Sequence, residues 1–444
     1  MDKKLSTRRA FLTALGSGTA ALAAGRAMAA TDDPAIRAMI EQTQRSSFGQ
    51  NFDSASRTIH MPKSSLPTLS PSTVDTTQVA VGQYEQIVAR GGWPMVPPMD
   101  RLRIGNRHPT VSVLRQRLAA GGDLDPAAGG GDVFDSYVEA AMKRFQARHG
   151  MNVDGVLRRE AFDALNISAP IRLAQLKLNV NRLRDLTSHL SERFVMCNIP
   201  AAQIEAVEDG VAVSRHIAVV GKTDRQSPLI DSKIVEVNFN PYWTVPASLI
   251  RKDLIPKMQK YPNYLAENKI RIFDSKGTEY QANQIDWHTD QATHFMFKQD
   301  PGALNSLGVV RINFPNNDQV YMHDTPSKNL FGDDFRFDSS GCVRVQNVRE
   351  LVAWLLKDNP GWSRHEIDDV IRSGARKDVR LTQPVPVHWV YVTAWATPDG
   401  VVQFRDDIYG RDGLGLVVKP PPSPEAEAEQ AEDASNRKMA NDAH

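Results

Sequence analysis

The chain has 444 residues, of which 41% are hydrophobic and 24% are charged, which is typical of a globular protein with two or three folded units. A formal net charge of +1 provides no global field for a polyanion, and no long basic stretch is interleaved with aromatic residues, so no nucleic acid is expected as a partner. Only two cysteines occur, Cys197 and Cys342, which argues against a domain held together by disulfides.

The first residues predict an export signal. A basic start leads to Arg8-Arg9 and then to a weakly apolar Ala/Leu/Gly run that ends at Ala27-Met28-Ala29. The run is too short and too rich in Gly and Ala to span a bilayer well, which disfavours a membrane anchor. We therefore interpret 1–29 as a twin-arginine signal peptide and expect a periplasmic protein.

Helical periodicity dominates the next part of the chain. Residues 30–100 are interpreted as a partly helical lead-in, 101–168 as a compact unit of three helices, and 169–193 as a bracing helix that Pro170 opens. The apolar positions that predict the three helices are Val111, Leu114, Leu118, Phe134, Val138, Phe145, Ala161, Phe162 and Leu165. At the other end, 417–444 consist mostly of Pro, Glu, Ala and Asp, which predicts disorder.

The unit at 101–168 contains Phe145-Gln146 and the tight turn Asp154-Gly155. These elements resemble the core of the small peptidoglycan-binding domain that many cell-wall enzymes carry. The residues alone are equally compatible with an ordinary three-helix bundle that contains a turn.

From residue 194 the period changes to two, which predicts strands and a β-rich domain over 194–416. The expected strands are 194–199, 204–207, 217–220, 234–239 and 309–314, with Asp209-Gly210 as a hairpin turn and two last strands around 398–400. Helices are expected at 348–356 and 366–371. Residues 247–307 are charged and interpreted as a helical insertion that caps the domain.

The two cysteines have different surroundings. Strand alternation groups Cys197 with Val195 and Ile199, which predicts a buried, inert thiol. Cys342 lies instead in the polar, turn-like run Ser339-Ser340-Gly341-Cys342-Val343-Arg344, downstream of Tyr321-Met322-His323-Asp324-Thr325-Pro326. A nucleophilic cysteine needs a nearby base, and a glycine before it permits a sharp turn that points backbone N–H groups at a developing oxyanion. We therefore predict Cys342 as the nucleophile, His323 as the base and Gly341 as the turn residue.

These two runs resemble the L,D-transpeptidase family with its YkuD-type catalytic domain, and in particular its large Gram-negative branch. The resemblance extends over the runs 240–246 and 404–410, and so covers roughly residues 84–413, which is most of the chain after the predicted signal peptide. Many family members have histidine where this chain has Ser340. The fold class implied is an α+β multidomain protein, in which a β-rich YkuD-type catalytic domain with a helical cap insertion follows a three-helix peptidoglycan-binding domain.

The resemblance also implies a reaction that needs no cofactor. Cys342 would attack the carbonyl of the third residue, a diamino acid, of a tetrapeptide stem and expel the terminal D-alanine. An amine of a neighbouring peptidoglycan stem peptide would then resolve the thioester and form a 3-3 cross-link. Water, a free D-amino acid or an amine of an outer-membrane protein could replace this acceptor, and carbapenem inhibitors would acylate the cysteine.

Four further residues are candidates for substrate binding. Arg344 follows the nucleophile on the same side of an extended backbone and could bind a substrate carboxylate or carbonyl, or form an ion pair with Asp333, Asp334 or Asp338. Tyr321 shares a strand face with His323, Ser340 precedes the Gly-Cys pair, and Trp243 could form a pocket wall, as could Trp287. Asp324 points the other way, and the family suggests that a backbone carbonyl orients the imidazole.

Two interpretations from other classes stay open at this point. A zinc peptidase could use His323 and Cys342 with His288 or His294, although no tightly spaced pair of ligands occurs. A non-catalytic protein could hold peptidoglycan through the helical unit alone, and the pair His323 and Cys342 is the feature that argues against it.

Overall fold

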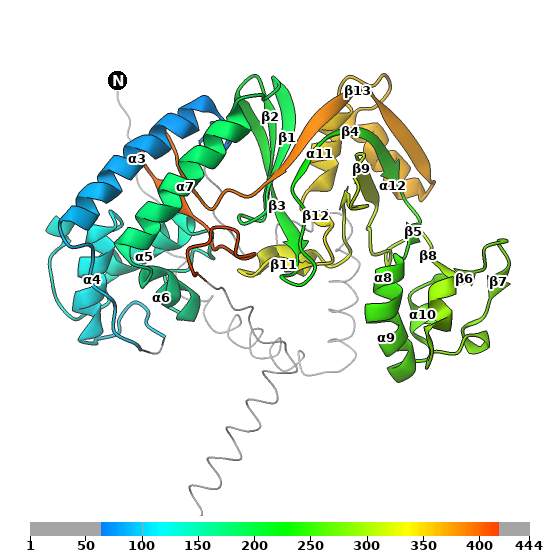
Figure 1. Ribbon diagram of the computed structural model, residues 1–444, viewed down its shortest axis with the longest axis horizontal. Coiled ribbons are helices and arrows are strands. Elements are labelled where there is room, and N and C mark those ends of the chain that lie inside the picture. Colours follow the sequence, from blue (N-terminus) through cyan, green and yellow to red (C-terminus); the bar gives the residue numbers. More distant parts are fainter. Residues whose placement is uncertain (1–63, 100, 417–444) are drawn as a thin grey trace, which may run out of the picture. The chain divides into compact units, whose positions relative to one another are not determined.

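The computed structural model describes residues 64–99 and 101–416 (Figure 1). The predicted signal peptide, the first part of the lead-in and the predicted disordered tail lie outside the described residues. Within the described ranges, no helix combines the length and the apolar character needed to cross a membrane.

The centre of the protein is a nine-stranded sheet in the order β11-β3-β12-β10-β9-β4-β13-β1-β2 (Figure 1). The long strand β3 also pairs with β2, so the hydrogen-bonded strands close into a ring. The strands are β1 Arg193–Asn198, β2 Gln203–Glu208, β3 Val211–Gly221, β4 Ile230–Phe239, β9 Val310–Asn313, β10 Met322–His323, β11 Phe337–Ser339, β12 Val343–Val345 and β13 Lys377–Val390.

Two helices complete this core. The amphipathic helices α11 (Val348–Leu355) and α12 (Arg364–Ser373) bury their apolar faces against the strands. The second has an Ser363/Glu366 capping box at its start and Gly374 in the left-handed conformation at its end. Both helices, the alternating strands and the Asp209-Gly210 hairpin turn agree with the sequence prediction.

The sequence analysis missed β13, although it is the long central strand between β4 and β1. Proline usually excludes a segment from a sheet interior, and this strand contains Pro384 and Pro386. The structure accommodates them because the register with β4 shifts between Arg380 and Val385, and β1 pairs only from Val387 onward.

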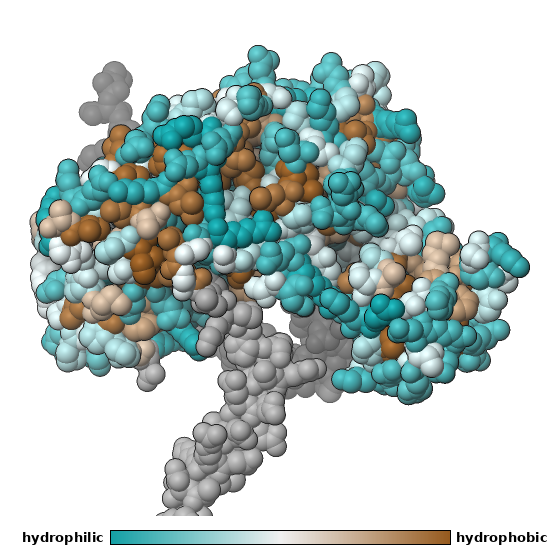
Figure 2. Space-filling model, in the orientation of Figure 1, coloured by the Kyte–Doolittle hydropathy of each residue, from teal (hydrophilic) through white to brown (hydrophobic). Residues whose placement is uncertain are grey.

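The insertion is also not purely helical. A separate four-stranded sheet, in the order β5-β8-β6-β7, accompanies its helices, and the sheet begins before residue 247, at Trp243. Its elements are β5 Trp243–Thr244, α8 Ala247–Leu249, η4 Ile250–Leu254, α9 Ile255–Lys260, α10 Tyr264–Glu267, β6 Ile270–Phe273, β7 Glu279–Tyr280, η5 Ala282–Gln284, η6 Asp290–His294 and β8 Met296–Gln299. This cap has its own apolar core, and its face in Figure 2 is predominantly hydrophilic.

The helical unit contains α4 (Thr110–Ala120), α5 (Ser136–Arg148) and α6 (Arg159–Leu165), with a short turn η3 (Pro126–Ala128), around one apolar core. The buried Gln146 explains why its two recognisable sequence elements occur together. The Gln146 side chain accepts a hydrogen bond from Gly155 N–H at 2.8 Å and donates one to Asp154 at 3.0 Å. Gly155 has a φ of 74°, which favours glycine.

Two long helices connect these parts. Helices α3 (Pro71–Ala89) and α7 (Ala169–Thr187) pack together and cover the hairpin of β14 (Ala394–Ala396) and β15 (Val402–Phe404). Farther along, Leu183 of α7 joins an apolar cluster with β1 and β2. The remaining short helix, η7 (Lys328–Gly332), packs on β3 through Phe331. The predicted bracing helix therefore contacts both the central sheet and the C-terminal hairpin.

Stability of the helical unit should depend on a buried ion pair. Arg148 contacts Asp123 through two hydrogen bonds of 2.7 and 2.6 Å, and the two side chains are only 8% and 3% exposed. Asp123→Ala leaves the arginine buried and unpaired, so we expect a loss of about 3–5 kcal/mol in the free energy of unfolding.

Urea denaturation followed by circular dichroism measures this loss. The matched control is Asp132→Ala, because Asp132 pairs with an arginine that is 69% exposed. That variant should lose less than about 1 kcal/mol. Equal losses in the two variants would contradict the role given to the buried pair.

Candidate active site

The nucleophile candidate and the base candidate lie on neighbouring strands. In the parallel pair β10–β12, Met322 is opposite Val343 and His323 is opposite Arg344. Val343 N–H donates to the Tyr321 carbonyl at 3.1 Å, which fixes Cys342 beside Tyr321 at the start of the pair. Because alternate residues of a strand share a face, Tyr321, His323, Cys342 and Arg344 all face one side of the sheet.

That side opens into a cavity of about 940 Å³ between the sheet and the cap. The predicted site residues that line it are Trp243, Tyr321, His323, Ser340, Cys342 and Arg344. The cap contributes residues between Val245 and Ile270, and the central domain contributes further lining residues, among them Lys222, Arg225 and Gln319. A cavity of this size can hold a short peptide, so the structure brings these candidates together at a plausible binding site.

Residues of the rival zinc interpretation do not meet at this cavity. His288 and Trp287 line a separate hollow on the cap, and Trp287 packs against Phe297 in the cap core. His294 lies in η6 of the cap and is not among the cavity residues either. Across the described part of the chain, no three His, Cys, Asp or Glu side chains are grouped so that they could hold a metal ion.

His323 is held by its own strand. Its Nδ1 lies 2.5 Å from the carbonyl oxygen of Asp324, so Nδ1 carries the proton and donates it, which leaves the Nε2 lone pair free to act as a base. The Asp324 carboxylate is engaged elsewhere, with Lys328 and with the Val309 N–H. A backbone carbonyl therefore orients the imidazole, as the family resemblance suggested.

Both reacting groups are neutral in the ligand-free site. Burial lowers the pKa of His323 to about 3, and the positive charge of Arg344 adds to the effect. Burial raises the pKa of Cys342 to about 11, although hydrogen bonds from Tyr321 and two nearby arginines favour the thiolate. The resting pair is thus a thiol and a neutral imidazole.

The turn before the nucleophile requires glycine, for a reason that differs in part from the prediction. Gly341 has a φ of 111°, which L side chains rarely adopt. Its N–H is not free for an oxyanion, because it donates to Ser339 Oγ at 3.2 Å. Cys342 N–H has no hydrogen-bond partner among the described residues, so this donor is available to a bound carbonyl.

Ser227 and Tyr409 hold this turn, and the sequence analysis assigned neither. The Ser227 hydroxyl donates to the Gly341 carbonyl at 2.8 Å and accepts from Gly221 N–H at 3.0 Å. The Tyr409 hydroxyl donates to the Gly221 carbonyl at 2.6 Å and accepts from Ser227 N–H at 3.1 Å. The tyrosine falls within the run 404–410 that resembles the family, which was the available signal.

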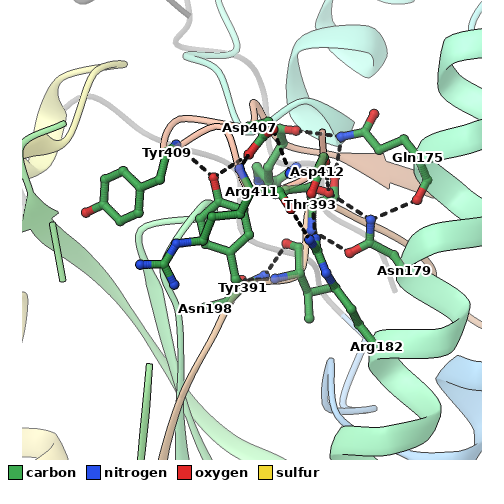
Figure 3. Close-up of polar contacts among 12 residues, drawn as sticks. Gln175, Asn179, Arg182, Asn198, Tyr391, Thr393, Asp407, Tyr409, Arg411 and Asp412 are labelled. Atoms are coloured by element: carbon green, nitrogen blue, oxygen red, sulfur yellow. Dashed lines mark hydrogen bonds and ion pairs between the residues drawn. The ribbon is translucent and has the colours of Figure 1, made fainter. Parts of the chain in front are cut away.

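Tyr409 is in turn fixed by a polar network that Figure 3 shows. Its N–H donates to the Tyr391 hydroxyl, which donates to the buried Asp407 carboxylate at 2.7 Å. Asp407 also accepts from the backbone N–H groups of Arg411 and Asp412. The neighbouring Thr393 connects this segment to Asn179 of α7, so the C-terminal segment and the bracing helix together support the nucleophile turn.

The remaining candidates have both binding and structural contacts. Arg344 lines the cavity and also lies 3.7 Å from Asp338, so the ion pair considered in the sequence analysis is present. Ser340 is exposed, and its hydroxyl accepts from Arg225 at 3.1 Å. Arg225 also binds the cap residue Asp253 with hydrogen bonds of 2.6 and 2.8 Å.

Comparison with known proteins identifies the domains. Residues 192–376 match the family model YkuD, described as "L,D-transpeptidase catalytic domain", and residues 107–165 match one described as "Putative peptidoglycan binding domain". A Haemophilus influenzae protein named "Putative L,D-transpeptidase" is 35% identical over 239 residues, which are 54% of this chain and 48% of that protein. The chain thus matches about half the length of this relative.

Solved structures with similarity include L,D-transpeptidases from Xylanimonas cellulosilytica and Stackebrandtia nassauensis. The first is 16% identical, is matched over 66% of this chain and 99% of its own, and has a TM-score of 0.23. The second is 13% identical, is matched over 66% of this chain and 97% of its own, and has a TM-score of 0.24. TM-scores this low do not establish a shared fold. The assignment of the domains therefore rests on the two family matches and on the Haemophilus influenzae protein.

Removing the Ser227 hydroxyl should impair the nucleophile turn. Ser227→Ala leaves the Gly341 carbonyl and the Gly221 N–H without this partner, so we expect acylation of Cys342 to slow about tenfold. Stopped-flow acylation by a carbapenem measures the rate. The control is Ser232→Ala, which removes an exposed hydrogen bond to Pro315 and should leave the rate unchanged. An unchanged rate in Ser227→Ala would contradict the positioning role.

The pH dependence of acylation should reflect a neutral pair. The folded-state pKa of His323 is lowered to about 3, so the base stays unprotonated as the pH falls from 8 to 5 and is lost only as the pH approaches 3. A resting thiolate and imidazolium pair would instead lose its reactive form near the ordinary histidine pKa of about 6.5. Acylation rates between pH 5 and 8 should therefore be nearly flat, with circular dichroism to verify folding. An inflection near pH 6.5 would contradict this assignment.

Proposed function

We propose that this chain, which carries a YkuD-type L,D-transpeptidase catalytic domain behind a peptidoglycan-binding domain, cross-links peptidoglycan through a thioester on Cys342. The observation that carries the proposal is the placement of Cys342 and His323 on adjacent parallel strands that face one peptide-sized cavity. The twin-arginine signal predicted over 1–29 agrees with a site of action in the periplasm.

The first half of the reaction forms the acyl-enzyme. His323 Nε2 takes the proton of the Cys342 thiol while the sulfur attacks the carbonyl of the third residue of a tetrapeptide stem. The Cys342 N–H donates to the oxyanion of the tetrahedral intermediate. When the intermediate collapses, the bond to the terminal D-alanine breaks, and that amine leaves with the proton that the imidazole received.

The second half transfers the acyl group. An amine of a second stem attacks the thioester, His323 accepts a proton from it, and the carbon–sulfur bond breaks as the thiol is regenerated. The product is a 3-3 cross-link. Cap residues line this cavity, and exclusion of water by the cap would favour transfer to an amine over the carboxypeptidase alternative.

Intact-protein mass spectrometry tests the nucleophile. Wild-type protein incubated with a carbapenem should gain the mass of one drug molecule, and with a tetrapeptide-containing wall it should release D-alanine and produce 3-3 linked muropeptides. Cys342→Ala should do neither and should fold normally, because alanine removes the sulfur and adds no strain.

Cys197 provides the matched control. It is fully buried on β1, and burial raises the pKa of its thiol, so Cys197→Ala should keep both the adduct and the cross-linking activity. A drug adduct on Cys342→Ala, or loss of the adduct in Cys197→Ala, would refute the assignment.

A further inference from the structure

A second hollow lies next to the active-site cavity. Its volume is about 410 Å³, and it shares Trp243, Pro246, Gln319, Val320 and Tyr321 with the cavity. These shared residues line both spaces, so the two spaces adjoin each other. Its own remaining lining includes Arg311, Asn313 and Phe314, and Arg311 is the one charged residue among all those that line it.

Arg311 belongs to a polar row that crosses the sheet. In the strand register, Asp378 of β13 is opposite Asn238, Asn238 is opposite Arg311, and Arg311 is opposite His323. The row continues from His323 to Arg344. The proposed base therefore lies between two arginines, and Arg311 is about 10 Å, or two strand spacings, from the strand that carries the nucleophile.

Arg311 has no counter-ion within the described ranges. No carboxylate there is within ion-pair distance of it, and its Nε is buried without a hydrogen-bond partner. The nearby acidic groups are engaged elsewhere: Asp378 binds Asn238 and Arg376, and Glu236 binds Asn238. Its guanidinium instead lies 4.3 Å from the centroid of the Tyr321 ring. An arginine that is half-buried and unpaired is costly to a fold, which indicates a ligand that pairs with it.

We propose that Arg311 binds the carboxylate that stands beside the attacking amine of the acceptor, so that the second hollow selects α-amino carboxylates. This inference rests on the proposed function, because it needs a thioester on Cys342. Guanidinium groups hold carboxylates through paired hydrogen bonds, which would fix the adjacent amine in one orientation. Suitable acceptors are free amino acids and diamino acids whose side chain ends as an amino acid.

The proposal separates two acceptors that the sequence left open. The amine of a protein lysine has no carboxylate beside it and would leave Arg311 unpaired. A stem peptide whose diamino acid ends in an amino group and a carboxylate satisfies it. Transfer to stems or free amino acids is therefore favoured over tethering of an outer-membrane protein.

Two acceptors that differ only at the carboxylate test this. After acylation by a tetrapeptide donor, the full chain is given D-phenylalanine or D-phenylalaninamide at equal concentrations of unprotonated amine, and transfer is measured by mass spectrometry. The wild type should prefer the carboxylate at least tenfold. Arg311→Gln should lose this preference by slowing transfer to D-phenylalanine alone, with the rate of donor acylation kept within about twofold.

Arg376→Gln is the matched control, because Arg376 is an exposed arginine near the same row that already pairs with Asp378. It should keep the preference, and Arg311→Lys should restore part of it. The inference would be overturned if Arg311→Gln slowed transfer to both acceptors equally or slowed acylation, because Arg311 would then act on the base. A lowered melting temperature in this variant would also overturn it, because Arg311 would then support the fold. A wild type that is acylated but shows no preference would also overturn it, whereas a wild type that is never acylated would refute the proposed function itself.

Discussion

The left-handed turn at Gly341 is the constraint on which the site depends. At a φ of 111° the chain leaves β11 and enters β12 so that Cys342 faces the cavity beside Tyr321. The turn needs support from other residues, and Ser227 fixes it through a hydrogen bond to the Gly341 carbonyl. Ser227 is in turn bound by Tyr409, and Figure 3 shows that the supports of Tyr409 extend to α7. The C-terminal segment is thus a structural part of the nucleophile turn.

The burial of the Cys342 thiol and the His323 imidazole keeps the ligand-free site unreactive. With a thiol pKa of about 11 and an imidazole pKa of about 3, burial disfavours proton transfer between the two groups. Two arginines in register with His323 lower the pKa of the imidazole but also favour the thiolate, so their effects on this proton transfer oppose each other. Burial therefore keeps the ligand-free pair as a thiol and a neutral imidazole.

Local sequence signals predicted most of what is local in the fold. The period of two identified five of the nine strands of the central sheet and both strands of the C-terminal hairpin, and the runs around His323 and Cys342 supplied the proposed base and nucleophile. The features that the sequence analysis missed have one physical cause in common: each depends on contacts with residues that are distant in the sequence. The strand β13 is stabilised by β4 and β1 despite its two prolines. Likewise, the proposed roles of Ser227 and Arg311 depend on the residues that the fold places beside them, so no local sequence pattern predicts these roles.

The cap is tied to the nucleophile turn, although it has its own sheet and its own core. Arg225 contacts Asp253 of the cap and Ser340, the residue before Gly341. Asp253 lies in η4, a stretch of π-helix, and such stretches are often found at functional sites. A ligand that displaces Asp253 would therefore also disturb the support of Ser340. Because Arg225 contacts both the cap and the turn, the cap helps to position Cys342. A movement of the cap should therefore alter the turn, and a movement of the turn should alter the cap.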